Sequence, residues 1–358
     1  MSHRVAIALS GGVDSLVSAS ILKDQGHEVF GVHFITRGGK PPDAATDEDA
    51  EIETASSVIN GPLGRAAETL GIELYALDLK EAFTESVVRP FVLEYARGRT
   101  PNPCVACNRD IKFGALLEKV TELGATHLAT GHYAGIVVDA QGRPSLVKGA
   151  DASKDQSYFL AMMKKQALGH ILFPLARLTK DKVREMARER SLSGFVRSES
   201  QDVCFAPGGD YRKILADWGM AGGPGPITDA KGRVLGTHSG LFSYTVGQRR
   251  GMGVAADRPL YVLRLEPGEN RLVVGYEEEV PALSATVSLI NWIEPAPLSP
   301  IRVLARVRYR SRPCGALLTP TGETNARLDF DHPVKALSPG QTAVFYSGDV
   351  VLGGGIID

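Results

Sequence analysis

The stretch Ala6-Ile-Ala-Leu-Ser-Gly-Gly-Val-Asp-Ser15, AIALSGGVDS, decides how the first half of the chain folds. Its apolar residues are typical of a buried strand, two glycines follow, and the next segment has apolar residues at helical spacing. Glycines in a strand-to-helix turn allow backbone amides to close around an anion at the helix N-terminus. A Gly-Gly pair alone often marks only a tight turn, but the hydroxyls of Ser10 and Ser15 favour a phosphate-binding turn.

This turn lacks the lysine with which the P-loop of ATPases and GTPases holds the β- and γ-phosphates. It carries Asp14 instead, and a carboxylate beside phosphates requires a cation between the two. Mg²⁺ is the cation that we expect there, because it binds both carboxylate and phosphate oxygens. The turn is therefore predicted to hold phosphate differently from a P-loop.

Strand and helix patterns alternate along the first half of the chain. The predicted strands are 4–9, 29–34, 74–77 and 127–130, and the predicted helices are 16–25, 66–70 and 116–123. This alternation indicates an α/β fold with a parallel sheet covered by helices on both faces. Ligands bind at the carboxyl ends of such strands, which is where Ser10 lies. Residues 36–64 are irregular and acidic in the middle, and we expect a mobile surface excursion there.

After about residue 207 the pattern changes, and the rest of the chain reads as all-β. Short alternating segments separated by turns lie at 260–275, 284–292, 301–312 and 341–355. A chain of 358 residues is too long for one ordinary core, so we expect two or three domains.

Composition places the chain among ordinary globular proteins, with 43% hydrophobic and 23% charged residues. It has no apolar run long enough to cross a bilayer, and its N-terminus leads directly into a strand without a signal region. Four cysteines are too few for a disulfide scaffold, so we expect a cytoplasmic protein. A net charge of −1 gives no reason to expect nucleic acid, so a polyanionic partner would need a local basic patch.

One segment of the second half offers such a patch. Arginines recur at even positions of 301–312, namely Arg302, Arg306, Arg308, Arg310 and Arg312. On a strand, side chains at this spacing point to one face, and a phosphate backbone is their natural partner. A solvated strand face is the alternative, but no carboxylates lie between these arginines. Arg249 and Arg250 are further candidates for RNA contact.

Two cysteines, Cys104 and Cys107, have Cys-x-x-Cys spacing in GRTPNPCVACNRDIKF, residues 98–113. Three basic residues lie close in sequence and are predicted to favour the thiolate by lowering the thiol pKa values. These residues are Arg99, Arg109 and Lys112.

The cysteines allow several interpretations. A zinc site would need a second cysteine pair, and His127 and His132 are not at ligand spacing. A thioredoxin-type dithiol lacks its surrounding fold. Together with Cys204, the pair could instead hold an iron–sulfur cluster with one iron left open for sulfide. Cys314 is predicted to be a buried core cysteine of the β-rich half.

Six motifs in order along the chain resemble the tRNA-specific 2-thiouridylases of the PP-loop ATP pyrophosphatase superfamily. They are SGGVDS, RTPNPCVACN, ATGHYA at 129–134, KDQSYFL at 154–160, SQDVCF at 200–205 and TVGQRRG at 245–251. The resemblance implies an α/β PP-loop domain of the adenine nucleotide alpha hydrolase type at 1–207. It also implies a small central tRNA-binding domain at 208–279 and a C-terminal β-barrel at 280–358.

The reaction implied by the resemblance uses ATP and Mg²⁺. ATP adenylates O2 of the wobble uridine, position 34, in tRNAs for lysine, glutamate and glutamine. A persulfide sulfur, supplied by a donor protein, then displaces AMP and leaves 2-thiouridine. Adenylation makes AMP the leaving group, and sulfur is a strong nucleophile at neutral pH. The glycine turn would then hold the departing pyrophosphate.

The resemblance also assigns residues. Cys204 would carry the persulfide, and Cys107 would be the partner thiol that attacks it or forms a transient disulfide with Cys204. ATP would be bound by Ala8, Leu9, Ser10, Gly11, Gly12, Val13, Asp14, Ser15, Phe34 and Gly131. The target base and tRNA would be contacted by Asn102, Pro103, Cys104, His132, Lys154, Asp155, Gln156, Arg308, Tyr309 and Gln341.

The sequence departs from the family pattern at two places. Cys104 stands where one common form of the family has aspartate, and a Trp- and Cys-containing stretch expected in 36–64 is absent. Two other functions remain open from the sequence. One is a PP-loop ATP pyrophosphatase that adenylates a small molecule, which would have no use for Cys204. The other is a tRNA-binding relative without turnover.

Overall fold

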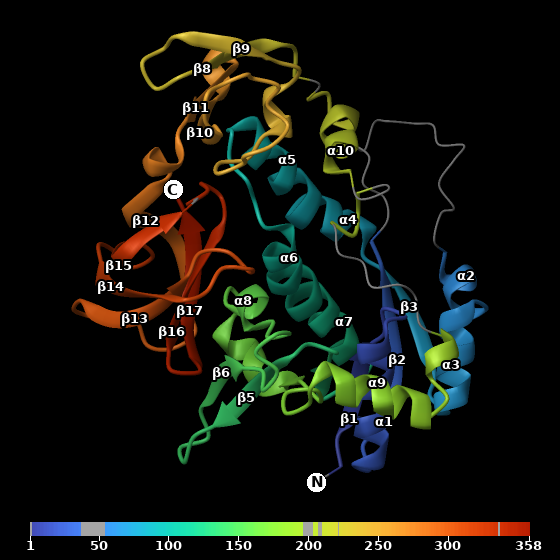
Figure 1. Cartoon of the computed structure of the whole chain (residues 1–358). Coiled ribbons are helices and arrows are strands. Elements are labelled where there is room, and N and C mark those ends of the chain that lie inside the picture. The colour runs from blue at the N-terminus through green and yellow to red at the C-terminus, as the bar shows by residue number, and fades with distance from the viewer. Residues whose placement is uncertain (1, 37–53, 196–202, 207–209, 221, 336) are drawn as a thin grey trace.

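Five parallel strands form the sheet on which the N-terminal half is built (Figure 1). The computed structural model describes residues 2–36, 54–195, 203–206, 210–220, 222–335 and 337–358. The sheet has the order β3–β2–β1–β4–β7, and Ile7 of the central strand pairs with Gly31 on one side and Ala129 on the other. Its strands are β1 (Arg4–Ala8), β2 (Glu28–Ile35), β3 (Leu74–Asp78), β4 (His127–Ala129) and β7 (Ile171–Leu172).

Successive residues of β1 point to opposite faces of the sheet, so each face has its own core. Val5 and Ile7 are buried against α1 (Val13–Asp24), α3 (Pro62–Leu70) and α9 (Lys180–Glu189). Ala6 and Ala8 belong to the core on the other face, with the helical segment from α4 to α7. That segment comprises α4 (Lys80–Phe83), η1 (Thr84–Val88), α5 (Arg89–Ala96), α6 (Pro103–Ala106), η2 (Cys107–Ala115) and α7 (Leu116–Glu122).

The second half of the chain forms two further sheets. The smaller one has the order β10–β11–β8–β9 and encloses the core around Ile227, Val262 and Leu272. Its strands are β8 (Gly225–Thr228), β9 (Val234–His238), β10 (Tyr261–Glu266) and β11 (Arg271–Gly275). Helix α10 (Tyr211–Asp217) precedes it, and short 3₁₀ turns η6 (Leu241–Ser243) and η7 (Pro267–Glu269) connect its strands. A further 3₁₀ turn, η8 (Glu277–Glu279), leads from β11 to the barrel.

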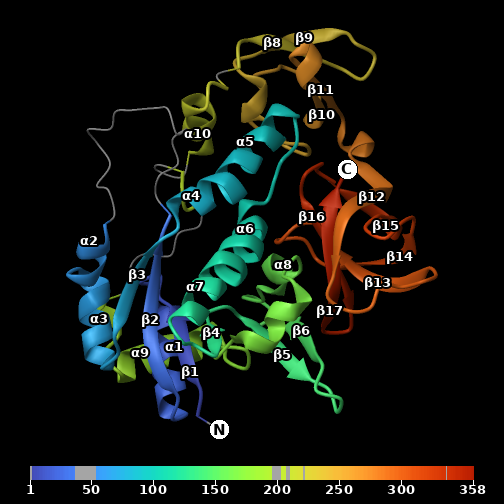
Figure 2. The same cartoon turned by 180° about the vertical axis from the view of Figure 1, so that it is seen from behind.

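The last six strands close into an antiparallel barrel, because β12 pairs with β15 on one side and with β17 on the other. They are β12 (Pro281–Trp292), β13 (Ile301–Arg306), β14 (Cys314–Pro320), β15 (Ala326–Lys335), β16 (Thr342–Ser347) and β17 (Val350–Ile357). Figure 2 shows α6 and α7 between the parallel sheet and this barrel. The chain therefore combines an α/β sheet, a central β domain and a C-terminal barrel.

A hairpin from the N-terminal half joins the barrel sheet. Strands β5 (Ala134–Val138) and β6 (Pro144–Lys148) extend it through a pairing of Val147 with Val350 of β17. The remaining helices of this half are short. One, α2 (Ala55–Ile59), precedes α3, and three follow the hairpin: α8 (Ser157–Leu160), η3 (Lys165–His170) and η4 (Ser193–Phe195).

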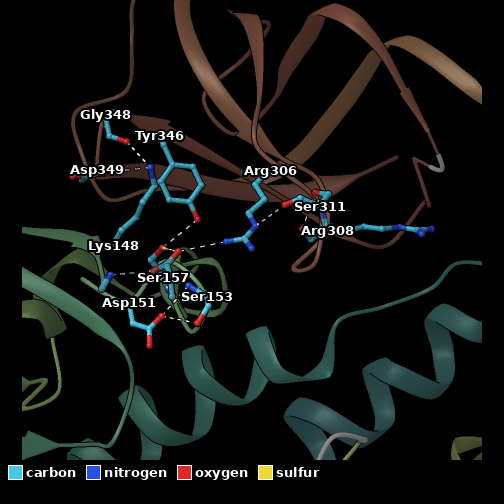
Figure 3. Close-up of polar contacts among 12 residues, drawn as sticks. Lys148, Asp151, Ser153, Ser157, Arg306, Arg308, Ser311, Tyr346, Gly348 and Asp349 are labelled. Carbon is cyan, nitrogen blue, oxygen red and sulfur yellow. Dashed lines mark hydrogen bonds and ion pairs between the residues drawn. The ribbon is translucent and has the colours of Figure 1, made fainter. Parts of the chain in front are cut away.

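A buried ion pair fastens the start of α8 to the barrel (Figure 3). Nη1 of Arg306 lies 3.4 Å from Oδ2 of Asp155, and their side chains are 16% and 5% exposed. Asp155 also accepts hydrogen bonds from the backbone amides of Gly149 and Ser157, so its charge is fully engaged. The guanidinium lies 5.3 Å above the ring of Tyr309. Removing either partner would leave an unpaired charge buried, which lowers the stability of the fold. The pair therefore holds the N-terminal half of the chain against the barrel.

The sequence predictions for the fold are mostly confirmed. All four predicted strands and all three predicted helices occur, and the later segments form the predicted hairpins and barrel strands. The expectation of an irregular 36–64 is wrong for its end, where α2 and the start of α3 lie, and residues 37–53 fall outside the described residues. No helix among the described residues has the length and apolar character needed to span a membrane.

The arginine prediction for 301–312 is wrong beyond Arg306. Strand β13 ends at this residue because Ala305 pairs with Cys314, so the chain between them must reverse direction. Nε of Arg306 donates to the carbonyl of Ser311 and closes this turn. Arg308, Arg310 and Arg312 therefore lie in a loop and do not share one strand face with Arg302.

We expect Arg306→Ala to lower the free energy of unfolding by about 3 kcal/mol, because it leaves the Asp155 carboxylate buried without its cation. Arg302→Ala is the matched control on the same strand, since it breaks an exposed, solvent-screened pair with Asp331 and should leave the free energy of unfolding nearly unchanged. Chemical denaturation of both variants measures the difference. Equal losses would show that the pair does not fasten α8 to the barrel.

Candidate functional site

A cavity of about 1910 Å³ opens at the carboxyl ends of β1 and β2 and extends to the barrel. The sheet contributes Leu9, Ser10 and Phe34 to its wall. Further contributors come from α6 and η2, from the segment before α8, from the Cys204 segment and from the barrel, and helices α2 and α3 add to the wall. They include Pro103, Cys104, Cys107, Lys112, Lys154, Cys204, Arg308, Tyr309 and Gln341. Residues predicted from motifs far apart in the sequence thus line a single space.

The glycine turn has the geometry of an anion site. Gly11 has φ of 77°, a left-handed conformation that glycine adopts without strain. Gly12 caps α1, and no side chain caps the amides of the first turn. The hydroxyl of Ser15 instead donates to the carbonyl of Gly12. First-turn amides without a side-chain cap, together with the positive end of the helix dipole, favour a phosphate there.

Gly131 lies directly against this turn. A Cβ at this position would come within 2.8 Å of the backbone carbon of Asp14 and 2.9 Å of the nitrogen of Ser15. Such distances are too short for any side chain, so only glycine fits. The ATGHYA motif therefore packs directly against the turn, in addition to any contact with a nucleotide.

The carboxylate of Asp14 is already paired with side chains of the protein. Its carboxylate receives the ammonium of Lys180, with Nζ 2.9 Å from Oδ1 and 2.8 Å from Oδ2. The hydroxyl of Tyr133 donates to the same carboxylate at 2.7 Å. In this arrangement the residue does not fit the Mg²⁺ ligand predicted from the sequence. Sequence reasoning missed Lys180, which lies 166 residues further along the chain, since nothing local links it to the turn.

The three cysteines of the predicted site differ in their surroundings. Cys107 is 9% exposed, whereas Cys104 and Cys204 are exposed at the cavity. Burial raises the pKa of the Cys107 thiol to about 12, and the ammonium of Lys112 partly opposes this rise. Burial within the cavity walls and the nearby Cys204 also raise the pKa of Cys104. The prediction of lowered pKa values is therefore wrong, because desolvation outweighs the cation.

Two of the three predicted cations are already engaged. Arg109 forms a two-point ion pair with Asp110, and Arg99 pairs with Glu94. Of the three, Lys112 is the cation that acts on both thiols. It also contributes, after burial, to the lowered pKa of His132.

The cysteines do not form a metal site in the part of the chain that the structure describes. No three side chains of His, Cys, Asp or Glu gather closely enough there to hold a metal ion. The arrangement therefore does not fit an iron–sulfur cluster at Cys104, Cys107 and Cys204, nor a zinc site. Cys314 is half-buried and packs against the barrel core, close to its predicted position.

Several residues assigned to tRNA contact hold the cavity walls together. Gln341 donates from Nε2 to the carbonyl of Thr100 at 2.7 Å, which ties the barrel to the RTPNP segment. Arg308 donates to the carbonyl of Val246 at 2.9 Å, and burial lowers its pKa. Four further members of this set also have partners within the protein. Asn102 bonds to Tyr158, His132 is buried beside Thr130, Asp155 pairs with Arg306, and Gln156 accepts from the backbone of Tyr133.

Comparisons with known proteins extend over nearly the whole chain. Three family models match: the tRNA methyl transferase HUP domain at 3–208, the tRNA methyl transferase PRC-barrel domain at 213–276 and the aminomethyltransferase beta-barrel domain at 284–357. The chain is 42% identical to tRNA-specific 2-thiouridylase MnmA of Halothermothrix orenii, over 99% of this chain and 98% of that protein. It is 43% identical to the protein of the same name from Geotalea uraniireducens, over 99% and 95%.

We expect alkylation of Cys107 by iodoacetamide to accelerate about tenfold per pH unit between pH 7 and 9, since the thiolate fraction rises at that rate below a pKa of about 12. Lys112→Met should slow alkylation of Cys107 roughly threefold to tenfold at each pH, because the thiolate loses its neighbouring cation. Peptide mass spectrometry resolves the sites, and Cys314 is the internal control. An unchanged Cys107 rate in the variant would contradict the role of Lys112.

Proposed function

The chain belongs to the tRNA-specific 2-thiouridylase family, whose members are ATP-using sulfurtransferases, and we propose how its residues convert a tRNA uridine to 2-thiouridine. The observation that carries the proposal is the shared cavity. A phosphate-binding turn, two cysteines from separate motifs and a wall of barrel residues all line it. The substrate that we propose is the wobble uridine, position 34.

The first step activates the base. The turn at Ser10 and Gly11, against which Gly131 packs, grips the pyrophosphate portion of ATP, while Phe34 lies near the rest of the nucleotide. O2 of the uridine attacks the α-phosphorus, the bond between the α- and β-phosphates breaks, and pyrophosphate leaves. The base is then joined to AMP through O2. Mg²⁺, when bound with ATP, would balance the charge of the phosphates.

The second step transfers sulfur. Cys204 carries a persulfide from a donor protein, and its terminal sulfur attacks C2 while AMP leaves with O2. Cys107 then attacks the inner sulfur as its thiol proton passes to the departing thiolated base, so a Cys107–Cys204 disulfide forms as the sulfur–sulfur bond breaks and C2 keeps its sulfur. An external dithiol must reduce this disulfide before the next turnover. Cys204 is exposed, so a donor protein can reach it to load the persulfide. Cys107 is buried, so it is protected until it attacks Cys204.

By the family resemblance, Cys104 stands where one common form of the family has aspartate. Its pKa is raised, so the thiol stays protonated at neutral pH and can donate a proton but not accept one. We propose that it hydrogen-bonds the target base beside Asn102 and Pro103, without taking part in sulfur transfer.

The tRNA must bring its base out of the stack to reach the cavity. We propose that Lys154, Tyr309 and the loop arginines guide the anticodon stem, and that the tRNAs are those for lysine, glutamate and glutamine. We propose three domains, at 1–207, 208–279 and 280–358. The second and third would hold the RNA while the first acts on one base. The ranges of the matching family models support this division. A cytoplasmic location follows from the substrate.

An adenylating enzyme for small molecules is the competing function. It would release AMP in the absence of tRNA and would leave Cys204 without a role. A tRNA-binding protein without turnover would hold RNA but form neither AMP nor 2-thiouridine. A mercury-containing gel, which retards thiolated tRNA, combined with an assay of AMP release, separates all three when ATP, Mg²⁺, a sulfur donor and unmodified tRNA are supplied.

We expect Cys204→Ser to abolish formation of 2-thiouridine while ATP-dependent AMP formation with tRNA remains measurable, because only the second step needs the persulfide. The gel reports thiolation and thin-layer chromatography reports AMP. Cys314→Ser, a cysteine outside the cavity, is the matched control and should thiolate normally. Continued thiolation by the Cys204 variant would overturn its assignment.

Replacing Arg310 and Arg312, both exposed in the loop after β13, by Ala should weaken tRNA binding and lower the slope of log affinity against log salt by about two. Arg327→Ala is the control, since this barrel arginine is also exposed but pairs with Asp329. Filter binding at several salt concentrations measures the slope. An unchanged slope in the loop variant would place the phosphate contacts elsewhere.

A further inference from the structure

The glycine turn has no lysine in its own sequence, but the folded chain places the ammonium of Lys180 against its Asp14. We propose that Lys180 is a positioning residue for ATP, which neutralises Asp14 so that the N-terminus of α1 can accept the polyphosphate. The inference rests on the proposed function, in which this turn holds the pyrophosphate of ATP. It assigns the carboxylate a different role from that of a metal ligand.

The lysine end of this pair is buried, whereas the Asp14 side chain remains 29% exposed. Lys180 is 5% exposed, and its ammonium reaches both oxygens of Asp14, at 2.9 and 2.8 Å. The hydroxyl of Tyr133 donates to Oδ1 at 2.7 Å, and the ammonium lies 5.9 Å from the centre of the Tyr133 ring. The carboxylate thus has a fixed cation and a fixed hydrogen-bond donor.

The fold holds the lysine in this position. Its backbone amide donates to Oδ2 of Asp151 at 3.0 Å, and the side chain of Thr179 caps the helix that it begins. Helix α9 packs on the same face of the sheet as α1, so the two helices approach each other at this point. Gly131 packs against the backbone of Asp14 and Ser15 in this turn. The ammonium therefore reaches the turn through tertiary packing, independently of the sequence around Gly11.

The electrostatic reason for the pair lies in the first turn of α1. The uncapped amides there and the helix dipole attract an anion, but a bare carboxylate in the same turn would repel the phosphates. Pairing with Lys180 cancels this repulsion and leaves the amides positive. A P-loop lysine contacts phosphate directly, whereas Lys180 acts on phosphate through Asp14.

This role and the role of Asp14 as a metal ligand predict different results for one substitution. If neutralisation is the function, Asp14→Asn removes the repulsion together with the need for Lys180, so ATP binding should persist. If the carboxylate must bind a cation, Asp14→Asn should abolish productive ATP binding whatever residue stands at position 180. The double variant decides between the two.

The experiment compares Lys180→Met, Asp14→Asn and the double variant in the full-length protein. Direct ATP binding by isothermal titration with Mg²⁺, in the absence of tRNA, is the first measurement. The KM for ATP and kcat of AMP formation with tRNA are the second. Lys182→Met is the matched control on the same helix, because this exposed lysine pairs along α9 with Glu185. Lys180→Arg tests rescue by another cation.

We expect Lys180→Met to weaken ATP binding and raise its KM by about tenfold or more, with a smaller effect on kcat. Asp14→Asn and the double variant should stay within about threefold of the unmodified protein, so the second substitution rescues the first. Lys180→Arg should retain part of the affinity.

Loss of ATP binding in Asp14→Asn, with a double variant no better than Lys180→Met, would overturn the inference. Should Lys180→Met fail to fold because a charge is left buried, the double variant still tests the proposal, since neither of its residues is charged. Titration of ATP alone keeps the result separate from the proposed function. If the variants bind ATP as expected but the unmodified protein makes no 2-thiouridine, the proposed function is contradicted and the role of Lys180 is not.

Discussion

The parallel pairing of β1 between β2 and β4 is the constraint on which the rest of the structure depends. Because carboxyl ends of parallel strands meet at one edge, Ser10, Phe34 and Gly131 arrive together from three distant motifs. The glycine turn can then close only because no side chain stands at position 131. Buried Val5 and Ile7 on one face and Ala6 and Ala8 on the other fix this register, since a slip of one residue would exchange the two cores.

A second constraint brings the thiols to that edge. Helical residues from Pro103 onward lie between the sheet and the barrel and bring Cys104 and Cys107 to the cavity that Cys204 also lines. Cys107 is buried in its wall, whereas Cys104 and Cys204 are exposed. The ion pair of Arg306 with Asp155 and the bond from Gln341 to Thr100 hold the barrel against this segment. Residues that the family resemblance assigns to tRNA therefore also shape the wall that the tRNA would meet.

The sequence predicted the parallel sheet and the position of its glycine turn, because both depend on local patterns. Strand alternation and a Gly-Gly turn are visible in ten consecutive residues. Prediction failed where tertiary contacts decide. The cation beside Asp14 proved to be Lys180 from another helix, and the raised thiol pKa values follow from burial. The arginines after Arg306 leave the strand because Ala305 pairs with Cys314 of β14. In each case the residue that decides the outcome is distant in sequence, so no local pattern around the affected residue predicts the contact.

The central claim is that the uridine oxygen becomes part of AMP before sulfur replaces it. Transcribed tRNA carrying ¹⁸O at C2 of the wobble uridine, incubated with ATP and a persulfide donor, tests this directly by mass spectrometry of the nucleotide product. We predict AMP that contains one ¹⁸O in its phosphate for each 2-thiouridine formed. Release of ADP, or of AMP without the label, would contradict the account.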